Sequence, residues 1–137
     1  MSASASPLFA SFYVALGGAL GAVARFQLGR VVTHWLGAGA VAAFPWATLA
    51  ANIIGSMAMG LVFGWLARNG SGAGEAQRLF LGVGLLGGFT TFSAFSLEML
   101  LLVERGQIGL AVTYAALSVL AGLAALYIGL LVMRAFA

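Results

Sequence analysis

Four long apolar segments separated by short polar connections dominate the hydrophobic pattern of the chain. A helix needs about 20 apolar residues to cross the hydrocarbon core of a bilayer. The pattern therefore predicts an all-α integral membrane protein with one domain. Its four transmembrane helices are expected over residues 8–32, 45–67, 79–103 and 107–133.

A cleavable signal peptide is the alternative interpretation of the first apolar segment. Signal peptides begin with a basic region, and no basic residue precedes residue 8. The first segment is therefore expected to remain as a membrane span.

The third apolar segment contains an unusual ten-residue stretch, GGFTTFSAFS, at residues 87–96. Paired glycines and paired threonines are poor helix formers, because glycine is entropically costly and threonine is stiff at χ1. The stretch predicts a helix that is broken in mid-membrane. Backbone groups freed there need protein, water or an ion as partners.

Aromatic and hydroxyl side chains are interleaved after the predicted break. Phe92 and Phe95 are spaced to share one helix face, while Thr90, Thr91 and Ser93 add hydroxyl groups beside them. This mixture suits a polar pathway with aromatic walls. The alternative is a glycine-kinked helix whose phenylalanines face lipid.

A few polar side chains stand out within the other spans. Thr48 and Asn52 lie four residues apart and form a short polar strip, although a membrane amide can also serve only to join helices. Glu98 is the one carboxylate well inside a span, which makes it a functional candidate or a group near the interface. Arg25 lies inside the first span and needs a partner or access to the interface.

Small residues recur at spacings that allow helices to approach closely. The pairs are Gly17 with Gly21, Ala51 with Gly55, Gly60 with Gly64, and Gly84 with Gly88.

Composition narrows the function classes. Of 137 residues, 63% are hydrophobic and 7% are charged, which exceeds what a soluble domain of this size can bury. The chain has no cysteine, and no catalytic triad, phosphate loop or metal-ligand cluster is recognisable, so an enzyme is not expected. The net charge of +3 is spread over segment ends, which argues against nucleic-acid binding.

Several motifs appear in order along the chain. They are GAVARF at residues 21–26, P-x-x-T-L-x-x-N-x-x-G-S at 45–56, GGFTTFSAFS at 87–96, and Y-x-x-x-S at 114–118. With them, nearly the whole chain resembles the CrcB/Fluc family of bacterial fluoride channels. The resemblance implies an antiparallel homodimer with two pores and a structural sodium ion at the dimer centre.

The resemblance also implies roles for individual residues. The backbone carbonyls of Gly87 and Thr90 would hold the sodium ion. Arg25 and Glu98 match family positions in a vestibule or interface. The expected fluoride pathway contains the residues Thr48, Asn52, Thr91, Phe92, Ser93, Phe95, Tyr114 and Ser118.

The arginines bear on orientation in the membrane. Four spans place Arg68, Arg78 and Arg134 on one side, and Arg25, Arg30 and Arg105 on the other. Orientation normally follows an excess of basic residues on the cytoplasmic side. A balance of three against three is typical of a chain that inserts both ways, as an antiparallel dimer requires.

The expected function is passive export of fluoride across the bacterial cell membrane, which limits fluoride toxicity. The expected partners are fluoride, the lipid bilayer and a second copy of the chain. A small dual-topology drug/proton antiporter is the alternative, but it needs a carboxylate in the first span, which has none. A structural subunit without transport activity is a third possibility.

Overall fold

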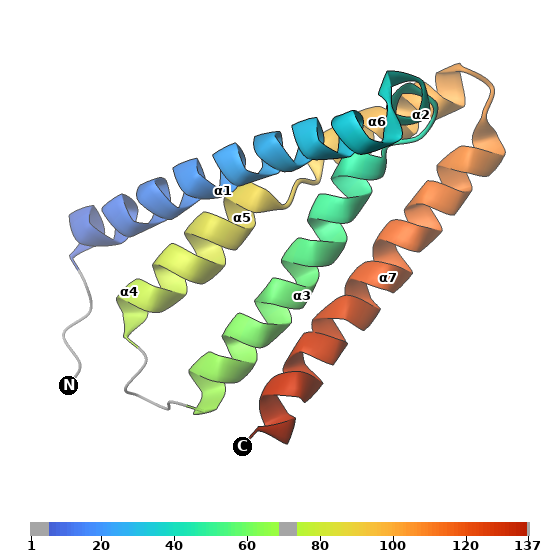
Figure 1. The fold of residues 1–137 in the computed structure, drawn as a ribbon. Helices are drawn as coiled ribbons and strands as arrows, with labels where there is room; N and C mark the ends of the chain where they lie inside the picture. Colours follow the sequence, from blue (N-terminus) through green and yellow to red (C-terminus); the bar gives the residue numbers. More distant parts are fainter. Residues whose placement is uncertain (1–5, 69–73, 137) are drawn as a thin grey trace.

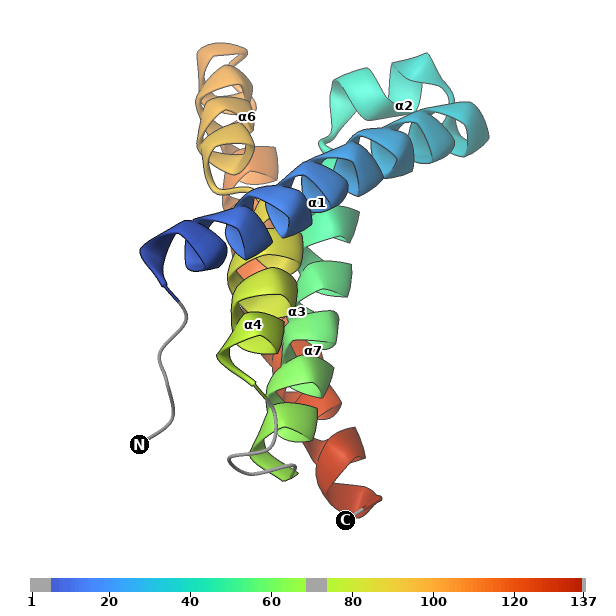
Figure 2. The ribbon, with the colours of Figure 1, turned by 90° about the vertical axis from the view of Figure 1, so that its left-hand side faces the viewer.

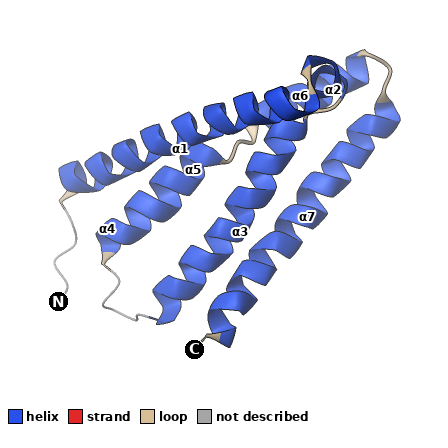
Figure 3. Cartoon of the chain, in the orientation of Figure 1, coloured by secondary structure: helices blue, strands red, loops and turns tan. Residues whose placement is uncertain are grey.

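Helices account for nearly all of the structure, a computed structural model that describes residues 6–68 and 74–136. No strand occurs in these two ranges, and the chain is drawn as helices joined by short turns (Figure 3). Four helical segments are long and apolar enough to cross a membrane: Pro7–Leu36, Trp46–Arg68, Glu75–Glu104 and Ile108–Ala135. The predicted all-α protein with four candidate spans is therefore confirmed.

The first span is longer than predicted and leads into an additional short helix. Helix α1 covers Pro7–Leu36 and ends at Gly37, whose φ of 83° lies in the left-handed region that glycine tolerates. Helix α2 then covers Ala38–Ala43, where the sequence suggested an irregular connection. Its alanines are the best helix formers, which explains the extra turn.

Helix α3 covers Trp46–Arg68 and α7 covers Ile108–Ala135, each as one uninterrupted helix. The two helices pack along each other over much of their length (Figure 1). The turn before α7 contains Gly106, with a φ of 73°.

Several helical pieces make up the third span. Helix α4 covers Glu75–Gln77, the π-helix η2 covers Arg78–Leu86, α5 covers Gly87–Phe89, and α6 covers Ser93–Glu104. Residues 90–92 are not helical, and Thr90 has extended dihedral angles of −82° and 160°. The π-helix was not anticipated from the sequence. Such wide turns often mark functional sites.

Glycine contacts bring α1 against the third span, which it crosses in Figures 1 and 2. A Cβ atom added at Gly17 or Gly21 would collide with the backbone of the third span, at Phe80 or Leu85. A Cβ atom at Gly84 would collide with the backbone of α1 in turn. The close approach predicted from these small residues is confirmed.

Small residues also join α3 to α7. A Cβ atom at Gly60 would meet the backbone of Leu126, and one at Gly129 would meet the backbone of Met57 and Leu61. The predicted packing role of Gly60 is thus confirmed at this second crossing.

Most large apolar side chains lie on the outside. Phe12, Leu20, Leu120 and Leu123 are among many that are at least half exposed. The buried apolar cluster is small by comparison and contains Phe44, Leu49, Leu102, Ala111 and Tyr114. An apolar exterior over four membrane-length helices identifies a multi-pass membrane protein.

Candidate functional site

Asn52 forms two hydrogen bonds with the non-helical segment of the third span. Its Nδ2 donates to the carbonyl oxygen of Thr91 at 3.2 Å, and the Thr91 N–H donates to Asn52 Oδ1 at 2.9 Å. One amide side chain on α3 thus satisfies both polar groups of a residue that has left the helix. Without such a partner, these groups would be costly in a membrane.

The threonine hydroxyls stabilise the same segment locally. Thr90 Oγ1 donates to the carbonyl of Leu86 at 2.9 Å, one turn earlier. Thr91 Oγ1 accepts a hydrogen bond at 3.2 Å from the N–H of Ala94, in the first turn of α6. It also lies 3.4 Å from the hydroxyl of Ser93. The hydroxyl groups of Thr90 and Thr91 therefore form hydrogen bonds within the segment around residues 90–92 itself.

Glu98 connects three helices. Its Oε1 accepts a hydrogen bond from Thr48 on α3 at 2.7 Å, and its Oε2 accepts one from Tyr114 on α7 at 2.8 Å. Tyr114 is fully buried, and its ring lies 5.1 Å from that of Phe95 and 5.5 Å from that of Phe44. The carboxylate is half-buried and accepts its hydrogen bonds from hydroxyl groups on two neighbouring helices.

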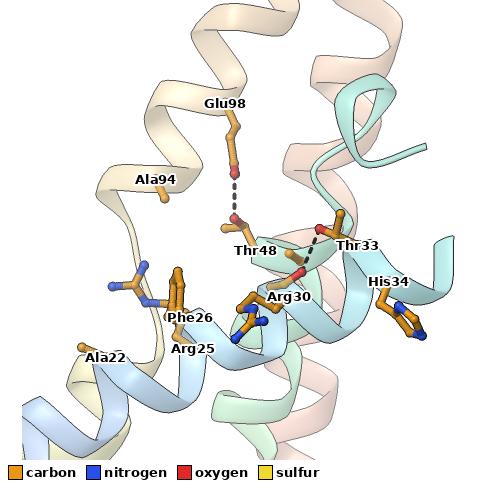
Figure 4. Close-up of a pocket in the computed structure, with 11 residues that line it drawn as sticks. Ala22, Arg25, Phe26, Arg30, Thr33, His34, Thr48, Ala94 and Glu98 are labelled. Atoms are coloured by element: carbon orange, nitrogen blue, oxygen red, sulfur yellow. Dashed lines mark hydrogen bonds between the residues drawn. The ribbon is translucent and has the colours of Figure 1, made fainter. Parts of the chain in front are cut away.

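The first of two larger pockets opens between α1, α3 and α6, with a volume of about 850 Å³. Figure 4 shows Glu98 pointing from α6 toward Thr48, while Arg25 reaches from α1 toward the third span. The Nε of Arg25 donates to the carbonyl of Gly88 at 3.4 Å. This bond gives the guanidinium group the partner that a charged side chain inside a membrane span needs. Arg30 and His34 also line this pocket, and Arg30 adds a second positive charge to it.

The second pocket, of about 570 Å³, lies beside the non-helical segment between α3 and α7. Phe92 is 79% exposed, and its ring centre lies 5.8 Å from that of Phe95. The Ser118 hydroxyl is buried but has no hydrogen-bond partner in the described part of the chain. The polar or aromatic residues lining this pocket are Asn52, Ser56, Thr90, Thr91, Phe92, Phe95 and Ser118.

Most of the site residues expected from the sequence therefore gather around two neighbouring pockets. Thr48, Glu98 and Arg25 line the first, while Tyr114 and Ser93 line neither. Ser56 also lines the second pocket and was not expected there from the sequence. Its position four residues after Asn52 was the available signal, because that spacing repeats a helix face.

Carbonyl groups in the non-helical segment and in α5 just before it are available. Among the described residues, no hydrogen-bond donor reaches the carbonyl oxygens of Gly87 or Thr90. Residues 6–68 and 74–136 contain no group of three His, Asp or Glu side chains suited to a metal ion.

Comparison with known proteins relates this site to a family. Residues 12–130 match the family described as "CrcB-like protein, Camphor Resistance (CrcB)". The chain belongs to the CrcB family. The match includes the whole second and third candidate spans and most of the first and fourth, and thus the Asn52 contact and the residues around Glu98.

Relatives within the CrcB family are similar over almost their full length. A protein of Novosphingobium aromaticivorans is 59% identical over 128 residues, which is 93% of this chain and 98% of the relative. A protein of Erythrobacter litoralis is 54% identical over 131 residues, covering 96% of each chain. Both are named "Fluoride-specific ion channel FluC".

A third relative, from Sphingopyxis alaskensis, has the same name and is 52% identical over 123 residues, or 90% of this chain and 94% of its own. All three relatives are named as ion channels and not as enzymes. Nothing in these names supports a drug/proton antiporter.

Proposed function

We propose that this chain forms a fluoride-selective channel through which fluoride leaves the bacterial cytoplasm. The observation that supports this most strongly is the second pocket, where amide, hydroxyl and aromatic groups meet beside a non-helical membrane segment. The names of relatives above 50% identity support the same function. Export of fluoride would limit its toxicity.

The chemistry of the second pocket suits a small anion. Fluoride holds water strongly, so a pore must offer hydrogen-bond donors in place of that water. The buried hydroxyl of Ser118 has no partner among the residues that the structure describes. The Asn52 amide has two N–H groups, of which one is bonded to Thr91. The rings of Phe92 and Phe95 have a positive edge that favours an anion.

The distribution of positive charge also suits conduction. The chain has no lysine, and none of its arginines lines the second pocket. A fixed cation there would hold fluoride too firmly, whereas conduction needs sites that the ion can leave. Arg25 lines the first pocket instead, where it would attract the anion toward a vestibule.

Glu98 would act by positioning. Its carboxylate accepts hydrogen bonds from the hydroxyls of Thr48 and Tyr114, and these bonds connect α6 to α3 and α7. The bond to Glu98 would orient Tyr114, whose ring packs on Phe95 at the second pocket. Thr48, Tyr114 and Ser93 would then support the pathway without lining the second pocket in one protomer.

The functional unit proposed here is an antiparallel homodimer of dual topology, whose third helix is broken in mid-membrane. The balanced arginines and the open pockets along residues 87–95 support this assembly. A second copy would close each pocket into a pore. The break would then lie at the dimer centre.

A structural sodium ion at that centre is part of the proposal. The carbonyls of Gly87 and Thr90 fit the role, because no donor in the described residues reaches them and sodium prefers oxygen ligands. A bound cation would supply a positive potential that does not titrate. The chain itself would supply the carbonyls and keep residues 90–92 out of the helix through Asn52.

Flux from purified protein in liposomes tests the function. Vesicles loaded with fluoride should release it to a fluoride electrode, and vesicles loaded with chloride should retain their anion. An inside-negative voltage favours anion exit by about 2.3 kcal/mol per 100 mV, so no nucleotide is needed. Proton-coupled uptake of organic cations would instead support the antiporter, and no flux of any kind would support a structural subunit.

A further inference from the structure

One face of α3 carries a row of three polar residues, Thr48, Asn52 and Ser56, which we call the α3 row. Each follows the last by four residues, about 6 Å of helix and slightly more than one turn. Thr48 is bonded to Glu98, and Asn52 is bonded to Thr91. The Ser56 hydroxyl lines the second pocket and has no partner among the described residues.

A matching row lies on the facing side of α7. It contains Tyr114, Ser118 and Gly122 at the same spacing, and we call it the α7 row. A Cβ atom added at Gly122 would lie 3.5 Å from Ser56 Oγ, so the two residues face each other directly. Because Gly122 has no side chain, nothing from the α7 row covers Ser56 Oγ at this level.

The free hydroxyls of Ser56 and Ser118 are unusual for this chain. Hydroxyls in apolar helices commonly donate to the carbonyl four residues earlier. Several hydroxyls here do so, namely those of Ser11, Thr33, Thr90, Ser96 and Thr113. Ser56 and Ser118 do not, within the described residues, and both line the second pocket.

We propose that Ser56 is a further fluoride ligand, one helical turn beyond the level of Asn52 and Ser118. Its hydroxyl can donate to an anion in the second pocket, and Gly122 opposite has no side chain that would cover it. Beyond Ser56 the pocket is lined by the apolar residues Met59 and Leu126, so Ser56 is the last polar group in that direction. This inference rests on the proposed fluoride channel and adds a residue to its pathway.

Removal of the hydroxyl tests the proposal. Ser56→Ala should lower the initial rate of fluoride efflux from liposomes about tenfold, because a hydrogen bond to an ion is lost. Ser11→Ala is the matched control, since its hydroxyl is bonded within α1, and it should conduct like the parent. If the parent and Ser56→Ala conduct equally, Ser56 is not a ligand. If the parent itself releases no fluoride, the proposed channel function fails as well.

A thiol at the same position separates a ligand from a packing residue. The chain has no cysteine, so Ser56→Cys introduces a single thiol. A small thiol reagent should react with it, the reaction should stop fluoride efflux, and added fluoride should slow the reaction. Ser11→Cys should react without loss of efflux. An unreactive thiol in a conducting Ser56→Cys channel, or a reaction that leaves efflux unchanged, would overturn the proposal.

Discussion

Asn52 is bonded to the non-helical segment and also lines the second pocket. Its amide presents a donor to one atom of Thr91 and an acceptor to another, and only a neutral amide matches both. The sequence left open whether Asn52 joins helices or lines a pathway. The structure shows the first role directly, and the position of Asn52 in the second pocket supports the second.

Asn52→Asp should reduce fluoride efflux by at least about tenfold. The carboxylate would place a negative charge in the second pocket and would face the Thr91 carbonyl with an acceptor. Efflux from liposomes, normalised to folded dimer by size-exclusion chromatography, measures the effect. Near-normal efflux from folded Asn52→Asp would remove Asn52 from the pathway.

Helix crossings are determined by backbone contact at glycine. Gly21 on α1 lies against Leu85 and Phe89, so α1 and the third span meet without intervening side chains. This contact supports the start of the segment that leaves the helix at Thr90. The crossing of α1 and the third span therefore lies directly beside the non-helical segment of the second pocket.

Gly21→Ala should lower thermal stability, because the added methyl group would meet backbone that has little freedom to move. Overpacking of this kind costs about 1–3 kcal/mol. Gly29→Ala is the matched control on the same helix, since a Cβ atom there has no neighbour within 4 Å. The midpoint of heat-induced loss of the size-exclusion peak measures both variants, and an unchanged midpoint for Gly21→Ala would contradict the close contact.

On the scale of the whole molecule, the arginines mark two opposite ends. Arg105 bonds to the carbonyl of Ala42 at 2.9 Å and joins α2 to the end of α6, at the top of Figure 1. Arg68 and Arg134 lie in the last turns of α3 and α7, at the bottom. Basic residues at both ends are consistent with the proposed dual topology, since orientation follows an excess of basic residues on one side.

Two added arginines should therefore bias the orientation. Ser71→Arg with Ala73→Arg, in the connection outside the described residues, should direct the chain ends to the cytoplasm. Cells with this protein alone should become fluoride-sensitive, because antiparallel partners would be scarce. Co-expression with an oppositely biased variant should restore resistance. Labelling of single cysteines reports orientation, and a parent found on one side only while still conducting would refute dual topology.

Some properties of this protein follow from its sequence alone. The number of spans follows from the length of apolar runs, since the bilayer accepts only satisfied helices of that length. Close packing at Gly17 and Gly60 followed from small residues at helical spacing. These features depend on residues that are near one another in the chain.

Tertiary structure decided the features that depend on how helices rotate and tilt against each other. The bonds from Thr48 and Tyr114 to Glu98 join residues 50 and 16 positions apart, and the Asn52–Thr91 pair spans 39 positions. The π-helix η2 also arises where glycines let α1 approach, a contact that local propensity does not encode. A rotation of α3 by part of a turn would preserve every sequence pattern yet separate Asn52 from Thr91, so only packing in three dimensions selects these contacts.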